Sequence, residues 1–224
     1  SDKPDIAYSI MDHIYFIDKF IDALHLDKII LVMHGYGSII GLNYAMRHSE
    51  KCRGLVFYEA WLRPVHRDDI SLPYQEQIIS FQEQDNINDL MMNGVYFVDK
   101  MLPQTVMREL NENELDHYRA PFKKQGSGKP LFQYLNELPT GENENAVTKI
   151  IAEYSNKLTQ SSLPKLLLYS LPGFITPIAT VIWAKKNLPA LEIAEVGEEL
   201  HYAQESNPTL MGETISVWLQ GIEH

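Results

Sequence analysis

The sequence predicts an α/β fold in which a mostly parallel sheet carries helices on both faces and is interrupted by an inserted group of helices. Residues 28–60 follow the order strand, helix, strand in about 30 residues, and such βαβ units build parallel sheets. Strand-like runs return only at 164–170 and 191–197. Because about 100 residues of helical pattern separate the two groups of strands, we expect an insertion within one sheet.

The elements of the first unit follow from residue spacing. Apolar residues recur at helical spacing over 9–25, which predicts a two-faced helix. The run 28–33 is apolar and rich in β-branched residues, so we expect a buried strand. A helix is predicted over 37–48, and a second buried strand over 52–60 ends before Pro64.

Helical patterns separated by Pro and Gly dominate the middle of the chain. This texture predicts two parts: a sheet core formed by 1–64 and 163–224, and a helical cap formed by 65–162. Four apolar or aromatic cap residues could line a pocket for a small apolar molecule: Phe81, Tyr96, Phe97 and Met101. For each of them, packing within the cap is the more common role.

The overall composition excludes several classes of partner. The chain has 224 residues and a formal net charge of −11, which argues against nucleic acid or an anionic membrane. No apolar run approaches the roughly 20 residues that span a bilayer. The single Cys52 fits a reducing compartment, so we expect a cytoplasmic protein, with the periplasm left open. Histidine spacing fits no metal motif, and we expect no metal and no organic cofactor.

The turn between the first strand and its helix, HGYGS, supports two interpretations. In the first, Gly35, Gly37 and Gly41 form a GxGxxxG turn that holds a dinucleotide at the helix N-terminus. Glu59, which ends the next strand, would then bind the ribose. The spacing differs from GxGxxG, however, and a dinucleotide fold does not predict the long helical insertion.

The second interpretation is a nucleophile elbow, the tight strand-to-helix turn that presents a reactive side chain. Gly35 occupies the position where Ser, Cys or Asp is expected, and Ser38 lies too far into the helix to replace it. We expect Ser38 to pack or cap locally. Glu59 ends the second strand and His201 follows the last strand, so an acid and a base follow the turn in hydrolase order.

Several longer motifs, in the same order, resemble the haloalkane dehalogenases of the α/β-hydrolase superfamily, a group to which coelenterazine luciferases are also similar. These are SDKPD, LVMHGYGSIIGLNYAMRH, YEAWLRP, LNENELDHYRAPF, LPKLLLYSLPGFITP and LHYAQESNP. The resemblance covers essentially the whole chain. It implies an α/β-hydrolase fold and hydrolysis of carbon–halogen bonds in small apolar haloalkanes, with halide as a product.

The resemblance also implies a role for each site residue. His201 matches the base, Glu59 matches the acid, and Tyr36 stands where a tryptophan donates to the departing halide. Tyr36 and Trp61 are therefore the expected substrate- or halide-binding residues. Gly35 stands at the nucleophilic aspartate. Without that carboxylate no alkyl-enzyme ester forms, so we expect an impaired or inactive enzyme. A non-catalytic protein that binds small molecules on the same scaffold is the alternative.

Family members also carry a portion before the SDKP motif, with the first strands of the sheet and a halide-binding loop. We expect these first strands to be missing here. Strand 28–33 would then form an open edge, which invites pairing with another chain. A fragment, a degenerate copy, or a sheet completed by self-association through strand 28–33 are the three explanations.

Overall fold

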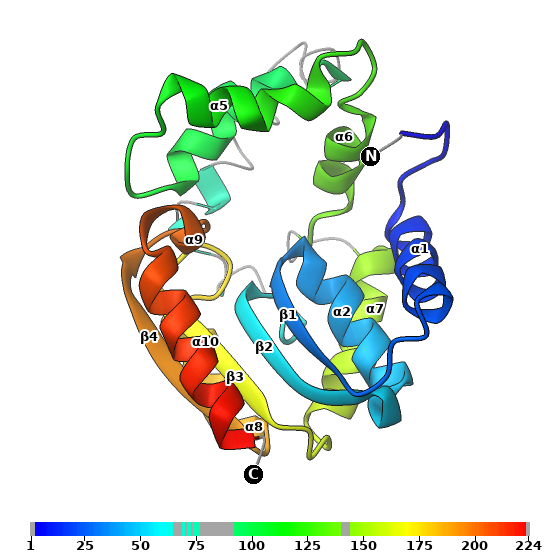
Figure 1. Ribbon diagram of the computed structural model, residues 1–224, viewed down its shortest axis with the longest axis vertical. Helices are drawn as coiled ribbons and strands as arrows, with labels where there is room; N and C mark the ends of the chain where they lie inside the picture. Colours follow the sequence, from blue (N-terminus) through cyan, green and yellow to red (C-terminus); the bar gives the residue numbers. More distant parts are fainter. Residues whose placement is uncertain are drawn as a thin grey trace.

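The computed structural model describes residues 3–64, 69, 71–72, 74–76, 92–139 and 144–222. Four strands form one parallel sheet in the order β1-β2-β3-β4 (Figure 1). Their bounds are Ile29–Gly35 (β1), Cys52–Ala60 (β2), Lys165–Pro172 (β3) and Leu191–Glu199 (β4). The predicted parallel sheet is confirmed, and each predicted strand lies within two residues of the observed one. Among the described residues, no helix is both long and apolar enough to cross a bilayer.

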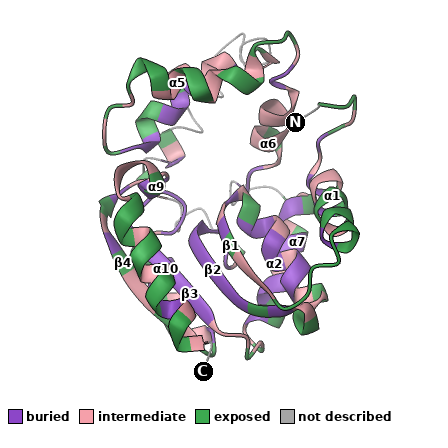
Figure 2. Ribbon diagram, in the orientation of Figure 1, coloured by how far each residue is buried: buried purple, intermediate pink, exposed green. Residues whose placement is uncertain are grey.

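Alternate residues of the central strands enter two separate cores, as expected for strands covered on both faces. Leu55 and Phe57 belong to the larger core, while Val56 and Tyr58 face the smaller one, which contains Trp218. Every residue of β2 except one is buried, which explains the nearly continuous apolar run in its sequence. Figure 2 shows the same burial along β2 and β3.

Helices cover both faces of the sheet. The helices that contribute to the larger core are α1 (Ile10–Ala23), α2 (Tyr36–Arg47), α7 (Ala146–Leu158) and α8 (Ile178–Asn187). The smaller core is covered by α10 (Pro208–Ile222), with the short α9 (Ala203–Ser206) beside it. Reciprocal side-chain and backbone hydrogen bonds cap the first turns of α1 and α7, at Ser9 with Asp12 and at Asn145 with Thr148.

The remaining described helical segments lie beyond the carboxyl ends of the strands (Figure 1). They are a π-helical turn at Phe97–Met101, 3-10 turns at Leu102–Thr105 and Ala120–Phe122, and helices α5 (Glu112–Arg119) and α6 (Lys129–Glu137). A further 3-10 turn, Ser49–Lys51, precedes β2. Helix α7 lies in the range assigned to the cap, yet it packs against α2 of the core. The cap segments therefore stand over the edge of the sheet at which its strands end.

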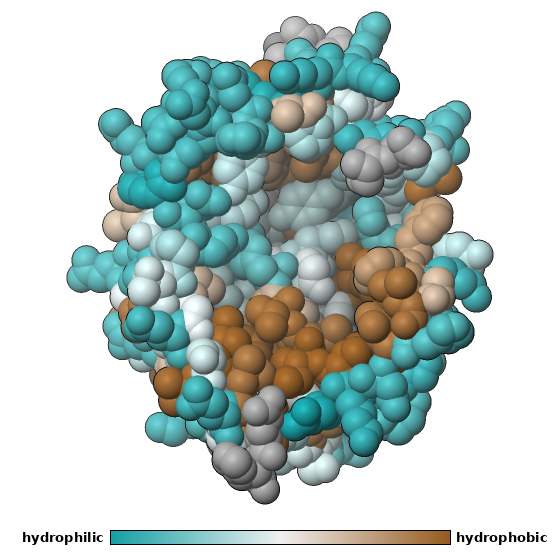
Figure 3. All heavy atoms as spheres, viewed as in Figure 1, coloured by the Kyte–Doolittle hydropathy of each residue, from teal (hydrophilic) through white to brown (hydrophobic). Residues whose placement is uncertain are grey.

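Strand β1 has one neighbour, β2, so its outer edge is open in the described part of the chain. The Val32 side chain on this edge is 62% exposed. Helix α1 buries Ile14 and Ile21 but leaves Phe16 and Phe20 at least half exposed. Its two-faced apolar pattern thus contains one buried stripe and one exposed stripe. Figure 3 shows apolar atoms gathered over the side of the sheet where β1 lies.

Candidate active site

The carboxyl ends of β1, β2 and β4 bring three predicted site residues together. Gly35 ends β1, Glu59 lies one residue before the end of β2, and His201 follows β4 by two residues. His201 Nδ1 lies 3.2 Å from Glu59 Oε2. On the other side of the ring, a Cβ atom built on Gly35 would lie 3.0 Å from His201 Nε2. The imidazole therefore stands between the carboxylate and the glycine.

The backbone at Gly35 has the conformation of a tight strand-to-helix corner. Its φ of 52° and ψ of −129° lie outside the regions that L-residues favour, and glycine adopts them without a Cβ clash. Ser38 fixes the corner from inside, because its hydroxyl donates to the Gly35 carbonyl at 2.7 Å and accepts from the Trp61 amide at 3.0 Å. Ser38 thus packs and caps locally, as expected.

Three backbone N–H groups donate hydrogen bonds to the carboxylate of Glu59. Its side chain is 1% exposed, and it accepts hydrogen bonds from the amides of Phe174, Ile175 and Thr176, in the loop after β3. The remaining partner is the imidazole of His201. A buried carboxylate needs such donors to offset its loss of water. The loop after β3 therefore fixes the acid, and the acid orients the histidine.

A second histidine, His34, lies directly behind His201. Their ring centroids are 4.3 Å apart, and His34 Nε2 lies 2.7 Å from the His201 carbonyl oxygen. Because a carbonyl only accepts, Nε2 of His34 carries the hydrogen. Burial, and then the proximity of His201, lower the pKa of His34 to about 3. A neutral imidazole therefore holds the backbone that carries His201.

The hydroxyl of Tyr36 does not face an open space beside Gly35. It donates to Glu137 Oε2 at 2.8 Å, and the backbone amide of Ile10 donates to the same oxygen at 2.8 Å. Burial and the bond to Glu137 raise the pKa of Tyr36 far above its usual value. The phenol has one hydrogen, so it cannot donate to a halide while it donates to Glu137.

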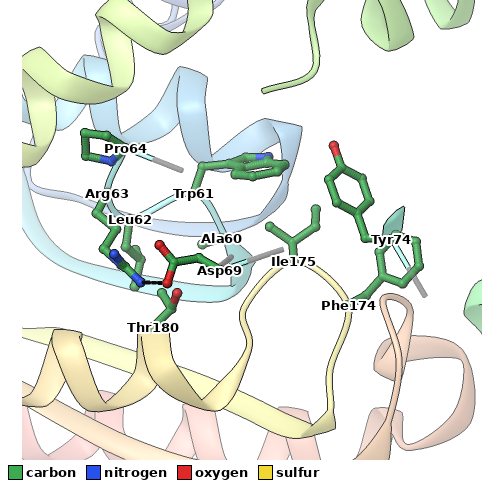
Figure 4. A pocket seen from close by; sticks show the side chains of 10 residues that line it. All are labelled: Ala60, Trp61, Leu62, Arg63, Pro64, Asp69, Tyr74, Phe174, Ile175 and Thr180. Atoms are coloured by element: carbon green, nitrogen blue, oxygen red, sulfur yellow. Dashed lines mark ion pairs between the residues drawn. The ribbon is translucent and has the colours of Figure 1, made fainter. Parts of the chain in front are cut away.

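Trp61 lines a pocket next to the corner, between the end of β2 and the loop before α8 (Figure 4). Its indole Nε1 is buried, and within the described residues it has no hydrogen-bond partner; the same holds for the Tyr74 hydroxyl. Their rings meet edge to face, with centroids 5.8 Å apart. Arg63 and Asp69 form an ion pair of 2.8 Å at the wall of this pocket.

A second cavity, open to solvent, has His201 in its wall. Its other lining residues come mostly from the cap and are mainly apolar: Phe97, Met101, Thr105, Tyr134, Leu135, Leu138, Phe174 and Tyr202. The expectation that Phe97 and Met101 line a pocket is confirmed. Tyr96 is not part of this lining, and Phe81 lies outside the described residues. Phe174 lines both pockets and links the two spaces.

The described geometry does not favour a dinucleotide at the corner. Glu59 is enclosed by three amides and His201, so its carboxylate is not available to a ribose. Gly41 faces the core, where a Cβ atom would lie 2.4 Å from the sulfur of Met33. Close packing of α2 on β1 therefore explains this glycine. Among the described residues, no cluster of three or more His, Cys, Asp or Glu side chains could hold a metal ion.

Three residues of the site had no assigned role in the sequence. Glu137 binds Tyr36 from a sequence separation of 101 residues, and Phe174 contributes both an amide to Glu59 and a ring to the cavity. No motif marks Glu137, which acts through a contact formed only in the fold, whereas Phe174 lies within the LPKLLLYSLPGFITP motif. His34 carried a signal, since it immediately precedes the corner.

Comparison with known proteins points to one group. The family model described as alpha/beta hydrolase fold matches residues 1–208. A haloalkane dehalogenase of Mesorhizobium japonicum is 32% identical over 98% of this chain and 72% of its own length. The coelenterazine h 2-monooxygenase of Renilla reniformis is 28% identical over 96% of this chain and 70% of its own length. The crystal structure of a haloalkane dehalogenase from Bradyrhizobium elkani, 30% identical, superposes with a TM-score of 0.91 over 100% of this chain and 77% of that one. This chain spans about three quarters of the length of these relatives.

Proposed function

The chain belongs to the haloalkane dehalogenases of the α/β-hydrolase fold family, and on this premise we propose that it binds small apolar haloalkanes beside His201 but releases little or no halide by turnover. The cavity that opens on His201 supports binding, because its wall is mostly apolar and aromatic side chains. The matches to the family model and to the relative from Mesorhizobium japonicum confirm the family expected from the sequence motifs.

The observation that carries the proposed impairment is the bare corner at Gly35. The family mechanism begins with a carboxylate at this position, which displaces halide and forms an ester that water then hydrolyses. Here the corner keeps the strained backbone of an elbow while it presents only hydrogen. Loss of such a nucleophile lowers the rate by a factor on the order of 10⁴ to 10⁶.

Halide release tests this proposal. We expect purified protein incubated with 1,2-dibromoethane to release no more than one bromide per chain, however long the reaction runs. Differential scanning fluorimetry should show a higher melting temperature as the haloalkane is added, because a ligand that binds only the folded state stabilises it. Bromide release over many turnovers would contradict the proposal.

Gly35→Asp asks whether only the nucleophile is lacking. The new Cβ would lie 3.0 Å from His201 Nε2, so the imidazole must move by a few tenths of an ångström to admit the carboxylate. Halide release above that of the parent chain would show that the acid, the base and the cavity remain competent. Gly37→Asp, two residues further along and with no heavy atom within 4 Å of its added Cβ, is the matched control and should release no more halide than the parent chain.

We further propose that segments of 65–162 form a cap that closes the pocket over the sheet core at 1–64 and 163–224. The described cap residues support this division, because Phe97 and Met101 line the cavity together with Phe174, which comes from the core. Helix α7 would belong to the core side, since it packs against α2. The buried, unpaired Cys52 fits a reducing compartment, and we propose a cytoplasmic location.

The open edge of β1 supports a further proposal, that two copies of the chain pair through this strand. Val32, in this strand, is 62% exposed, and apolar atoms gather on the face of the molecule drawn in Figure 3. Two identical edges related by a two-fold axis can exchange hydrogen bonds as antiparallel neighbours, which satisfies the backbone groups of both. A second copy is therefore the occupant we propose for this edge.

The molar mass of the protein in solution shows whether the β1 edge is free in a monomer or paired in a dimer. We expect light scattering coupled to size exclusion to give a dimer for the parent chain and a monomer for Val32→Lys, since an edge lysine opposes strand pairing. Val217→Lys changes a 69% exposed residue on α10 and should remain dimeric. A parent chain that is monomeric at all concentrations would exclude pairing through β1.

A further inference from the structure

We propose that Nε2 of His201 is itself a nucleophile toward haloalkanes, so that one bound haloalkane alkylates the histidine and the chain is consumed in the process. The inference rests on the proposed function, because it requires a haloalkane in the cavity beside His201. It differs from hydrolysis in its product, which is a stable bond between the imidazole and the alkyl group.

The position of the imidazole is the first argument. In an elbow with a side chain, the space next to the corner belongs to the nucleophile. Here Nε2 of His201 lies 3.0 Å and Cε1 lies 3.1 Å from where the Cβ of residue 35 would stand. The ring has thus taken the space nearest the corner. Nε2 is therefore the nitrogen of the ring nearest the corner, and His201 also lines the cavity.

The protonation pattern of the ring is the second argument. Nδ1 of His201 lies 3.2 Å from a carboxylate oxygen of Glu59, and that carboxylate already accepts from three backbone amides. A carboxylate accepts hydrogen bonds, so Nδ1 carries the ring hydrogen and the neutral imidazole has its lone pair on Nε2. In the described part of the chain Nε2 has no hydrogen-bond partner. The lone pair is therefore free to attack.

The environment is the third argument. The His201 side chain is largely buried, and its cavity is lined by apolar and aromatic groups such as Phe97, Leu138 and Phe174. The apolar walls can hold a haloalkane against the ring, and the positive charge that develops on the imidazole during attack is stabilised by the Glu59 carboxylate. A haloalkane bound there places its carbon next to Nε2, which replaces a bimolecular reaction by an effectively unimolecular one.

The step balances without a further reactant. The lone pair of Nε2 forms a bond to the halogen-bearing carbon, and the carbon–halogen bond breaks, with its electron pair leaving as halide. The product is an N-alkyl imidazolium that keeps its hydrogen on Nδ1, and its positive charge is compensated by Glu59. Unlike an ester, this product has no carbonyl for water to attack. One halide is therefore released per chain.

Competing nucleophiles are less suited to the reaction. Burial raises the pKa of the Cys52 thiol to about 11, so it is protonated at neutral pH, and it begins β2 at the opposite end of the sheet. His34 lies behind His201, with its Nε2 directed at the His201 carbonyl. His117 is exposed on α5 and has no apolar cavity around it among the described residues, so it serves as the control position.

Mass spectrometry of the whole protein tests the inference. After incubation with 1-bromobutane we expect a mass increase of one butyl group, peptide mapping that places it on His201, and one bromide released per chain. His201→Gln should abolish the adduct, and His117→Gln should leave it unchanged. Glu59→Gln should slow its formation at least tenfold, because the amide no longer fixes the hydrogen on Nδ1. Circular dichroism shows whether each variant is folded.

The outcomes are separable. No butyl group on His201 in parent protein that haloalkane stabilises against heat would overturn the inference and leave the proposed function intact. An adduct only on another residue would overturn it as well. Bromide released over many turnovers would overturn both. Because mapping is done on the parent protein, a variant that fails to fold does not remove the test.

Discussion

Replacing Gly35 by alanine tests the geometry of the corner, on which the proposals about its chemistry depend. The φ of 52° and ψ of −129° lie in a region where an L-residue is strained by about 1–3 kcal/mol. The added methyl also meets the His201 ring at 3.0 Å, and overpacking of this kind costs about 1–3 kcal/mol. Allowing for relaxation of the ring, we expect Gly35→Ala to lower the free energy of unfolding by about 2–4 kcal/mol.

Gly37→Ala is the matched control, two residues away. Gly37 is exposed in the first turn of α2, its added Cβ has no heavy atom within 4 Å, and its φ is not positive. Alanine there lowers the conformational entropy of the unfolded chain and should raise the free energy of unfolding by about 0.4–1 kcal/mol. Urea unfolding followed by circular dichroism gives both values, provided that the slope of the transition is unchanged.

The comparison has a clear refuting result. If Gly35→Ala unfolds at the same urea concentration as the parent or at a higher one, residue 35 does not have the conformation of an elbow. The proposals that Gly35 replaces a nucleophile and that His201 fills its space would both fail with it.

Three other substitutions probe the groups around the corner and the sheet. The pKa of His34 falls from 6.5 to about 3 on folding, so just below pH 6.5 only the unfolded state gains a proton. The free energy of unfolding should therefore decrease by about 1–2 kcal/mol between pH 7 and pH 5. In urea unfolding, His34→Gln should remove this part of the decrease. Equal pH slopes for the parent and His34→Gln would contradict it. Glu59→Gln should lower stability by about 1–3 kcal/mol in thermal unfolding, because the glutamine side chain has only one acceptor oxygen for the three backbone N–H groups that bind Glu59. An unchanged melting temperature would be inconsistent with these contacts. Lys165 is fully buried and donates to the carbonyls of three loop residues, so Lys165→Met should lower the free energy of unfolding by about 1–3 kcal/mol. Lys149 is exposed, and Lys149→Met should have no effect. Equal stabilities of the two variants would argue against the hydrogen bonds of Lys165.

The strands were predictable because their signal is local. A parallel strand covered on both faces must be apolar at nearly every position, and 52–60 met that condition and is buried at all but one residue. The apolar run 28–33 predicted a buried strand as well, but the strand there is mostly half-buried and Val32 is exposed, so that prediction of burial was wrong. The boundaries shifted where local chemistry gave no signal: β1 continues through His34 to Gly35, since pairing with β2 extends to the corner itself. Tertiary pairing therefore decided the end of the strand.

The positions of Glu59 and His201 were also accessible from the sequence, because parallel strands end at one edge and loops after them converge. The short distance between Glu59 and His201 follows from the order of the strands. The roles of acid and base come from the order of the motifs, and they remain predictions. The partner of Tyr36 was not accessible. Glu137 lies 101 residues away in α6, and no local pattern marks a glutamate that will bind a phenol across the fold.

The exposed stripe of α1 was not predicted either. Apolar residues at helical spacing show that a helix is amphipathic, but not how much of the apolar arc another element covers. Ile14 and Ile21 are buried, while Phe16 and Phe20 remain at least half exposed. The depth of burial is a property of the neighbouring elements, and a single helix carries no information about it.

The carboxylate of Glu137 ties together parts of the molecule that are distant in sequence. It accepts from Tyr36 at the corner and from the first residue of α1, while helix α6 contributes Tyr134 and Leu135, and the residue that follows it, Leu138, to the cavity wall. Any displacement of α6 away from the corner would break both hydrogen bonds at once. This one side chain therefore couples the wall of the cavity to the first turns of both α1 and α2.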